Sequence, residues 1–291
     1  MTHSNKTHPM FAGFKKLEVT DNQNKISFPL LLMYPTEEPS KHVKLGPFSV
    51  EANPEAPIKQ GVLPLVIISH GGGGNYLGYL TIAQHLAEQG YIVASLEHYK
   101  NNRKNNDLGN TKENLENRPH HVNLTIEAIY SDPFFKDHFD KENIAIIGHS
   151  LGGYTALAVA GGKPWTRNKE AVLVTPHPSV KAIILLAPAT SFFSPKGSLD
   201  NVTIPIYLVV AEKDDITPIN HSEIVSSGIP DKSKLLFEEV KNAGHFSFLS
   251  PFPKSLTHRK IIPSQDPDGF DREAFHRSLN KKILQFLSTV F

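Results

Sequence analysis

Short apolar runs alternate along the chain with segments whose apolar residues recur at helical spacing. Six of the runs suit buried strands, and they lie at 63–70, 91–98, 144–147, 180–188, 204–214 and 233–240. Helices are expected at 80–90, from about Pro119, directly after Ser150 and near 275–287. Because strands and helices alternate at short range, the sequence predicts an α/β fold with a mostly parallel central sheet flanked by helices.

The segment before residue 63 has a different pattern. Residues 13–34 read as two half-buried strands joined at the polar stretch Asp21–Asn24, which predicts an N-terminal β-hairpin. Residues 35–61 hold five prolines and little periodicity, so we expect a connecting loop. Residues 101–117 and 251–269 are expected to be lids or surface loops.

Length and charge limit the class of protein. A chain of 291 residues with 39% hydrophobic content can build one large core, and we expect a single domain over residues 1–291. The formal net charge is +1, which lacks the basic excess of a nucleic-acid binder or a polybasic membrane binder. The expected partner is a small molecule, and the sequence leaves the oligomeric state open.

The absence of cysteine excludes disulfides, zinc thiolate sites and a cysteine nucleophile. The first residues lack the apolar core of a signal peptide, and no later run approaches the ~20 apolar residues of a membrane span. We therefore expect a cytoplasmic protein with no integral membrane segment.

The clearest chemical motif is Gly-His-Ser-Leu-Gly at 148–152, between a strand-like run and a helix of small residues. This is the G-x-S-x-G pattern of a nucleophile elbow, in which a sharp turn exposes the serine hydroxyl above the sheet. Glycine is required on either side because the backbone approaches too closely to admit a Cβ. The chain has neither a Walker loop nor a G-x-G-x-x-G motif here, so Ser150 is the candidate nucleophile.

A second motif, Ser69-His70-Gly71-Gly72-Gly73-Gly74, leaves a strand and precedes a helix. A hydroxyl nucleophile needs donors around the developing oxyanion, and in such folds these are the amide after the nucleophile and one amide of a glycine-rich loop. Leu151 and Gly72 are the candidate donors. The alternative is that the four glycines only turn the chain.

The candidate base is selected by its position relative to the serine. In this arrangement an Asp or Glu and then a His follow the nucleophile, which leaves His177, His221, His245, His258 and His276. His245 lies just beyond an expected strand, at the sheet edge where Ser150 also emerges, so it is the preferred base. Asp214 and Asp215 both follow a strand at this edge, and either could orient the imidazole.

Other groups of polar residues do not predict a metal or a cofactor. His120-His121 and the stretch 137–140 contain histidines and aspartates, but neither has the H-E-x-x-H spacing of a catalytic zinc site. We expect no metal and no cofactor.

Together these motifs resemble the α/β-hydrolase superfamily, and more closely the predicted dienelactone hydrolase group related to platelet-activating-factor acetylhydrolase. The similar blocks lie at 44–71, 86–98, 116–122 and 143–162.

The resemblance implies a triad of Ser150, Asp214 and His245, with Asp214 preferred to Asp215, and an oxyanion donor at Gly72. The chain has His120-His121 where the family usually has a small residue and Asp. True dienelactone hydrolases use a cysteine nucleophile, so this chain cannot share their mechanism.

The predicted function is a serine carboxylic-ester hydrolase that acts on small or short-acyl esters through an acyl-enzyme intermediate. The same triad could serve a thioesterase, an amidase or a perhydrolase, because fold does not fix function. A hypothesis of another class is a binding protein that keeps the hydrolase fold without turnover.

Overall fold

The computed structural model describes residues 10–291, and ten strands in them form one sheet in the order β10-β9-β8-β7-β5-β6-β2-β1-β4-β3. The strands are β1 (Phe11–Asp21), β2 (Ile26–Thr36), β3 (Lys41–Leu45), β4 (Phe48–Pro54), β5 (Leu63–Ser69), β6 (Ile92–Leu96), β7 (Phe139–His149), β8 (Val180–Leu186), β9 (Ile206–Ala211) and β10 (Leu235–Val240). The six strands from β5 onward all pair in parallel, which confirms the predicted α/β class.

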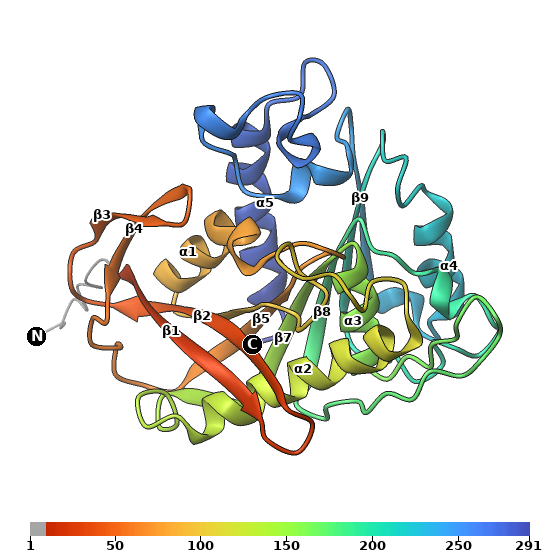
Figure 1. Cartoon of the computed structure of the whole chain (residues 1–291), viewed down its shortest axis with the longest axis horizontal. Helices are drawn as coiled ribbons and strands as arrows, with labels where there is room; N and C mark the ends of the chain where they lie inside the picture. Colours follow the sequence, from red (N-terminus) through yellow and green to blue (C-terminus); the bar gives the residue numbers. More distant parts are fainter. Residues whose placement is uncertain (1–9) are drawn as a thin grey trace, which may run out of the picture.

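Helices cover both faces of this sheet (Figure 1). They are α1 (Leu80–Glu88), α2 (Lys112–Ser131), α3 (Leu151–Val159), α4 (Asn220–Gly228) and α5 (Arg272–Leu287). The apolar residues of α1 and α5 belong to one core, and those of α2 and α3 belong to a second core. Neighbouring residues of the central strands alternate between the two cores: Leu65 and Ile67 face α2 and α3, whereas Val66 and Ile68 face α1 and α5.

The N-terminal hairpin is confirmed, since β1 pairs antiparallel with β2 from Phe11↔Thr36 to Asp21↔Ile26. The expectation of a loop over 35–61 is wrong, because β3 and β4 form a second antiparallel hairpin there. In β4 the side chains of Phe48, Val50 and Ala52 are buried at every second position. This short alternation was outweighed by the prolines, which lie mostly beside the two strands rather than within them.

The helix expected from about Pro119 begins earlier, at Lys112, so the predicted loop 101–117 is helical at its end. Thr111 caps the helix by accepting a hydrogen bond from the Asn114 amide at 3.0 Å. Pro119 has no amide hydrogen to donate to the Leu115 carbonyl, and the Tyr154 hydroxyl donates to that carbonyl instead, at 2.9 Å. A tertiary contact therefore allows the proline inside the helix.

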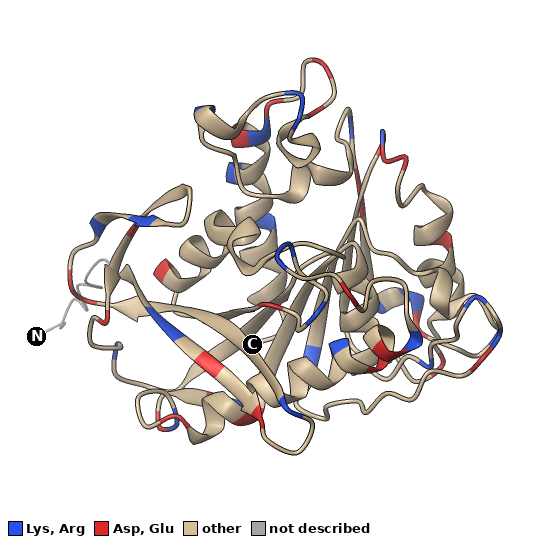
Figure 2. Cartoon of the chain, viewed as in Figure 1, with Lys and Arg blue, Asp and Glu red and all other residues tan. Residues whose placement is uncertain are grey.

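The sheet order fixes where a ligand would bind. The chain runs from β5 to β6 on one side and then crosses to β7 on the other side of β5, so the switch point lies at the carboxyl ends of β5 and β7. β5, β6 and β9 contain no Lys, Arg, Asp or Glu, and Figure 2 shows the charged positions mostly on helices, loops and the outer strands. Within residues 10–291, no helix combines the length and apolar character that a membrane crossing requires.

Candidate functional site

Ser150 lies at the switch point, between the end of β7 and the first residue of α3. Its φ of 54° and ψ of −120° are a strained conformation for a residue with a side chain. A Cβ on Gly148 would overlap the Gly152 backbone, and a Cβ on Gly152 would overlap the Ser69 carbonyl. The two glycines are therefore required by close approach, as the motif predicted.

Asp214 and His245 form a buried pair at the same edge. The Nδ1 of His245 donates to Asp214 Oδ2 at 2.8 Å, and the two side chains are 3% and 1% exposed. Thr217 supports the carboxylate, because its amide donates to Asp214 Oδ1 and its hydroxyl lies 2.8 Å from Oδ2. Asp215 is exposed and does not take this position.

Burial alone would raise the pKa of the Asp214 carboxyl, but hydrogen bonds from His245 and Thr217 outweigh this effect and lower the pKa to about 2. The carboxylate therefore stays ionised and holds the imidazole with its Nδ1 as donor. This orientation leaves the other ring nitrogen of His245 free to act on a hydroxyl.

The loop of His245 lies directly beside the elbow. The Nε2 of His149 donates to the His245 carbonyl at 2.9 Å, and the centroids of the two rings are 4.9 Å apart. Among the described residues, 10–291, no hydrogen bond joins the Ser150 hydroxyl to the imidazole of His245. Hydrogen bonds of this type often form only when substrate closes the site.

The glycine loop after β5 lies over the elbow, since a Cβ on Gly71 would be 3.1 Å from the Ser150 Cβ. The Gly71 carbonyl accepts hydrogen bonds from His70 Nδ1 at 2.7 Å and from the Gly74 amide at 3.1 Å. In a trans peptide the carbonyl and the following amide point in opposite directions, so these bonds fix the direction of the Gly72 amide. Within residues 10–291, no group accepts a hydrogen bond from the Gly72 amide.

The second candidate donor is the amide of Leu151. Leu151 is the first residue of α3, and the first amides of a helix have no partner within it. A Cβ on Gly72 would lie 3.6 Å from the Leu151 side chain, so the two candidate donors are neighbours. The site therefore offers two backbone amides to an oxygen atom held above Ser150.

A buried tyrosine links the glycine loop to the elbow. The Tyr79 hydroxyl donates to His149 Nδ1 at 2.9 Å and accepts a longer bond from the Gly71 amide at 3.4 Å. Because His149 Nε2 donates to the His245 carbonyl, a single chain of hydrogen bonds connects the glycine loop, the elbow and the histidine loop. Burial lowers the pKa of His149 to about 3, so this imidazole is neutral.

Arg118 supports the glycine loop from below, and its side chain is fully buried. The guanidinium donates to the His70 carbonyl, to Asn101 Oδ1 at 2.5 Å and to Thr155 Oγ1 at 3.0 Å. Within residues 10–291, no carboxylate forms a salt bridge with Arg118. It is thus a buried cation that is held by neutral acceptors alone.

Three buried histidines surround this cation. His70 Nε2 accepts from the His98 amide at 3.1 Å, and His98 Nδ1 lies 3.2 Å from His121 Nδ1. Burial and the nearby Arg118 lower the pKa values of His70 and His121 to about 3, and that of His98 well below its usual range. The cluster is therefore neutral apart from Arg118.

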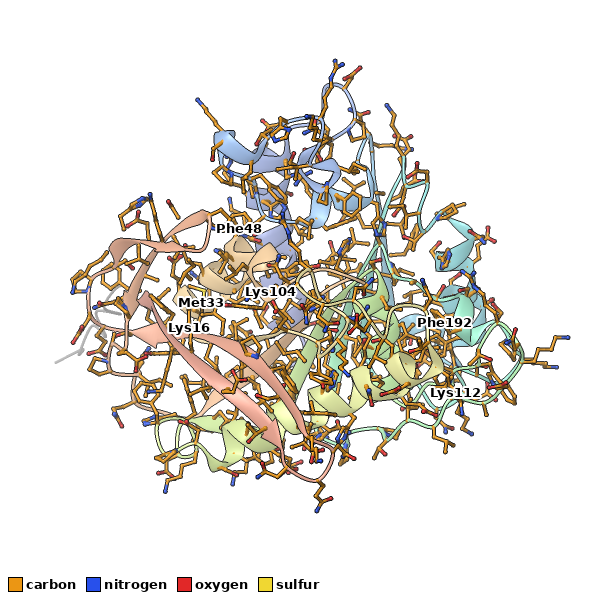
Figure 3. All side chains as sticks on the ribbon, viewed as in Figure 1. Lys16, Met33, Phe48, Lys104, Lys112 and Phe192 are labelled. Atoms are coloured by element: carbon orange, nitrogen blue, oxygen red, sulfur yellow. The ribbon has the colours of Figure 1, made fainter. Side chains whose placement is uncertain are left out.

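Two cavities lie on either side of the candidate centre. The larger, of about 700 Å³, includes Gly73 and Gly74 of the glycine loop, and the smaller, of about 340 Å³, includes Leu151. Figure 3 labels Phe48 and Lys104 of the larger cavity, which lie well apart in that view from Lys112 and Phe192 of the smaller one. The segments 101–117 and 251–269 both contribute to the larger cavity.

The structure brings together Ser150, Asp214, His245, Gly72 and Leu151 at one edge. The other histidines that follow Ser150 lie elsewhere or have other partners; His221, for example, accepts from the Thr190 amide. No three or more His, Cys, Asp or Glu residues within 10–291 are placed to hold a metal ion.

Sequence reasoning missed the supporting groups Thr217, Arg118, Tyr79 and His149. Only Thr217 had a local signal, in the Asp-x-x-Thr spacing that favours a side-chain turn. The remaining three reach the site through tertiary packing.

Comparisons with known proteins agree with this topology. The family described as the alpha/beta hydrolase fold matches residues 64–196. With the parallel sheet and the turn at Ser150, this match shows that the chain has the α/β-hydrolase fold.

The curated relatives that match share about a quarter of their aligned residues with this chain. Cutinase est1 of Thermobifida alba is 24% identical over 185 residues, which are 62% of this chain and 53% of that protein. The bis(hydroxyethyl) terephthalate hydrolase of Streptomyces coelicolor is 24% identical over 188 residues, which are 64% of this chain and 52% of that protein. The chain thus spans about half the length of the curated relatives it matches.

Solved structures match over nearly the whole chain. A ferulic acid esterase from Streptomyces cinnamoneus has a TM-score of 0.67 at 15% identity, over 99% of this chain and 91% of that one. A dienelactone hydrolase-like promiscuous phosphotriesterase from metagenomic libraries has a TM-score of 0.63 at 14% identity, over 97% and 99%. A dienelactone hydrolase-like protein therefore shares this fold, and the closer likeness to the group related to platelet-activating-factor acetylhydrolase stays a prediction.

Proposed function

We propose that this chain is a serine hydrolase of carboxylic esters, with Ser150, His245 and Asp214 as its triad. His245 takes the proton of the Ser150 hydroxyl as its oxygen attacks the ester carbonyl carbon. The amides of Gly72 and Leu151 donate to the carbonyl oxygen as it becomes an oxyanion. The protonated imidazole, stabilised by Asp214, then gives its proton to the departing alcohol.

The second stage repeats these steps with water. His245 removes a proton from a water molecule that attacks the acyl-enzyme carbonyl, and the acid is released as Ser150 regains its proton. The Asp214 carboxylate, which is 1% exposed, stays bound to Nδ1 of the ring in both stages. The reaction needs no group beyond the substrate and water.

The observation that carries the proposal is the meeting of three features at one sheet edge. A serine held at positive φ, a carboxylate-bound imidazole and two backbone amides without acceptors come from β7, β9, β10 and β5, which are far apart in sequence. Relatives named as cutinases, a terephthalate ester hydrolase and a ferulic acid esterase support ester bonds as the target.

The test is hydrolysis of p-nitrophenyl acetate by the wild type and by Ser150→Ala. Because triad members act as a unit, we expect kcat to fall by about 10⁴-fold or more. Ser131→Ala is a control that removes an exposed serine hydroxyl at the carboxyl end of α2, just before the amino end of β7, and it should retain activity. Undiminished turnover in Ser150→Ala would overturn the proposal.

A matched series of ester, thioester and amide substrates then separates the predicted esterase from a thioesterase or an amidase. We expect kcat/KM to be highest for the ester with the same acyl group. A preference for the amide would replace the ester assignment, while the triad assignment would stand.

A further inference from the structure

The larger cavity lies beside the candidate oxyanion loop, and Gly72, Ser150 and His245 are not among its lining residues. Gly73 and Gly74 form part of its wall, and they follow the proposed donor Gly72 in the chain. A substrate whose carbonyl oxygen meets Gly72 can therefore extend along the next two residues into a space of about 700 Å³. This volume suits a small organic ligand.

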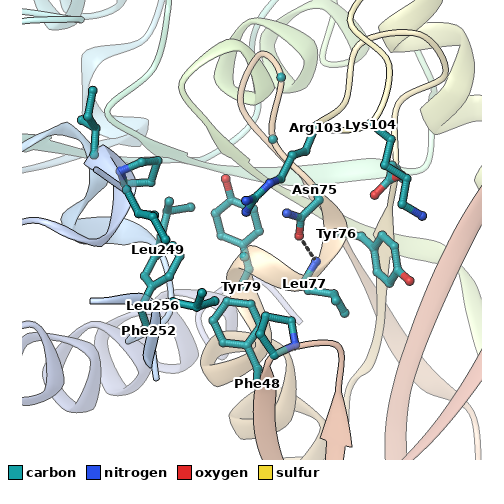
Figure 4. A pocket seen from close by; sticks show the side chains of 18 of the residues that line it. Phe48, Asn75, Tyr76, Leu77, Tyr79, Arg103, Lys104, Leu249, Phe252 and Leu256 are labelled. Atoms are coloured by element: carbon teal, nitrogen blue, oxygen red, sulfur yellow. Dashed lines mark hydrogen bonds between the residues drawn. The ribbon is translucent and has the colours of Figure 1, made fainter. Parts of the chain in front are cut away.

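The floor and one wall of the cavity are apolar. Phe48 comes from the tip of the β3–β4 hairpin, and Leu249, Phe252 and Leu256 come from the segment after His245 (Figure 4). The ring centroids of Phe48 and Phe252 are 5.6 Å apart, so the two segments meet in an aromatic contact. An apolar or aromatic body fits this part of the cavity.

The lining also carries positive charge, from the segments 101–117 and 251–269. Arg103, Lys104 and Lys260 line the cavity, and the Arg103 side chain points into it near Tyr79 in Figure 4. Glu97 is the one acidic residue of the lining; burial raises the pKa of its carboxyl, and Lys104 beside it acts in the opposite direction. When Glu97 is ionised its charge balances that of Lys104, which leaves Arg103 and Lys260 as an excess of two positive charges.

Neither of these two cations has an internal acidic partner. Within residues 10–291, no carboxylate forms a salt bridge with Arg103 or Lys260. Exposed cations at the mouth of an apolar cavity attract an anion through water and bind it more tightly once apolar walls reduce its hydration. Within residues 10–291, no internal salt bridge therefore competes with a ligand for Arg103 or Lys260.

Backbone hydrogen bonds fix Arg103 and the start of the segment after His245 relative to the candidate oxyanion loop. The Arg103 amide donates to the Gly74 carbonyl at 2.8 Å, and the Ser250 amide donates to the Gly78 carbonyl at 2.8 Å. Asn75 caps the turn between these points by accepting from the Leu77 amide at 2.9 Å. These backbone bonds join both cavity walls to the loop that would hold the reacting carbonyl.

We propose that this cavity binds the anionic end of the substrate, namely a carboxylate on a short apolar or aromatic body, with Arg103 and Lys260 as the recognising cations. This inference depends on the proposed ester hydrolysis at Ser150. The preferred substrates are then monoesters that carry a free carboxylate at a distance from the scissile bond.

Two pairs of esters test the preference. Mono-p-nitrophenyl glutarate and p-nitrophenyl butyrate differ in charge on the acyl side, and 4-acetoxybenzoate and phenyl acetate differ on the alcohol side. For each pair, kcat/KM of the anionic ester is divided by kcat/KM of the neutral ester. In a double variant with Arg103→Gln and Lys260→Gln, we expect this ratio to fall about five- to tenfold for one of the two pairs. Added NaCl should reduce the wild-type ratio towards that of the variant.

Lys136→Gln is the matched control, because Lys136 is exposed just before the amino end of β7, at the opposite edge of the sheet. It should leave both ratios unchanged. If the double variant changes neither ratio, or if Lys136→Gln changes a ratio equally, the proposal is wrong.

A binding measurement separates this proposal from the proposed function. Titration calorimetry of benzoate and benzamide with the wild type should give tighter binding of benzoate, and the double variant should lose this difference. Selective benzoate binding by a protein that hydrolyses no ester would retain the cavity and overturn the hydrolase. Hydrolysis of neutral esters without selective benzoate binding would support the hydrolase and overturn the proposed anion-binding cavity.

Discussion

Two groups of buried histidines lie near charges of opposite sign. His245 donates to the Asp214 carboxylate, an arrangement that stabilises the imidazolium formed when a hydroxyl loses its proton. His70 and His121 instead lie buried near the Arg118 guanidinium, and burial together with that charge lowers their pKa values and keeps them neutral. Burial and the neighbouring charge, rather than the residue type, therefore separate the imidazole proposed for proton transfer from those that stay neutral beside the candidate oxyanion loop.

The largest expected effect concerns the carboxylate side of this comparison. Asp214→Asn removes the acceptor that fixes the His245 tautomer, so we expect kcat for p-nitrophenyl acetate to fall about 10⁴-fold. Asp215→Asn is the matched control, since Asp215 is adjacent but exposed, and it should stay within about twofold of the wild type. Equal losses in the two variants would remove Asp214 from the triad.

The next largest effect is expected for Arg118, the buried cation near His70 and His121. Arg118→Lys keeps the charge but cannot reach the His70 carbonyl, Asn101 and Thr155 together. We expect the free energy of unfolding in urea to fall by about 2–4 kcal/mol, because buried acceptors lose their donors. We also expect kcat, measured well below the unfolding transition, to fall about tenfold as the oxyanion loop loses its support. A destabilised variant with full kcat would show that Arg118 serves the fold alone.

Tyr79→Phe tests the hydrogen bonds that connect the glycine loop to the elbow. The change leaves His149 Nδ1 and the Gly71 amide without the hydroxyl, which should cost about 1–3 kcal/mol of unfolding free energy and lower kcat severalfold. Tyr34→Phe is the control, because the Tyr34 hydroxyl is also buried and donates to the Ala56 carbonyl at 2.9 Å in the N-terminal region. It should cost similar stability and leave kcat unchanged; equal kcat values in the two variants would contradict the proposed linkage.

The smallest effect per group is the pH dependence of stability. The pKa values of His70, His121 and His149 are about 3 in the folded protein and about 6.5 in an unfolded chain. Between these values the unfolded state binds more protons, so stability falls as pH falls, by at most about 1.4 kcal/mol per pH unit and group. The melting temperature should decrease between pH 6.5 and 5, where most carboxylates are still ionised; a constant value there would contradict neutral buried histidines.

The contrast between these groups also marks what the sequence could predict. The strands of the parallel sheet and the sharp turn at Ser150 followed from local apolar runs and from the G-x-S-x-G motif, whereas the order of the strands was not predicted. The β3–β4 hairpin was not predicted, because the prolines beside the two strands outweighed a short alternation of apolar residues. The start of α2 at Lys112 was not predicted either, because Tyr154, distant in sequence, satisfies the carbonyl that Pro119 leaves free. The role of Arg118 was not predicted, because its acceptors come from three segments that only the folded chain brings together.

The most direct test of the central claim is the covalent intermediate itself. After the wild type is mixed with p-nitrophenyl acetate and quenched in acid, peptide mass spectrometry should find one acetyl group on Ser150. Ser150→Ala should carry none, and His245→Gln should acquire it far more slowly. An acetyl group on another residue that alone supports turnover, or rapid hydrolysis by Ser150→Ala, would contradict the account.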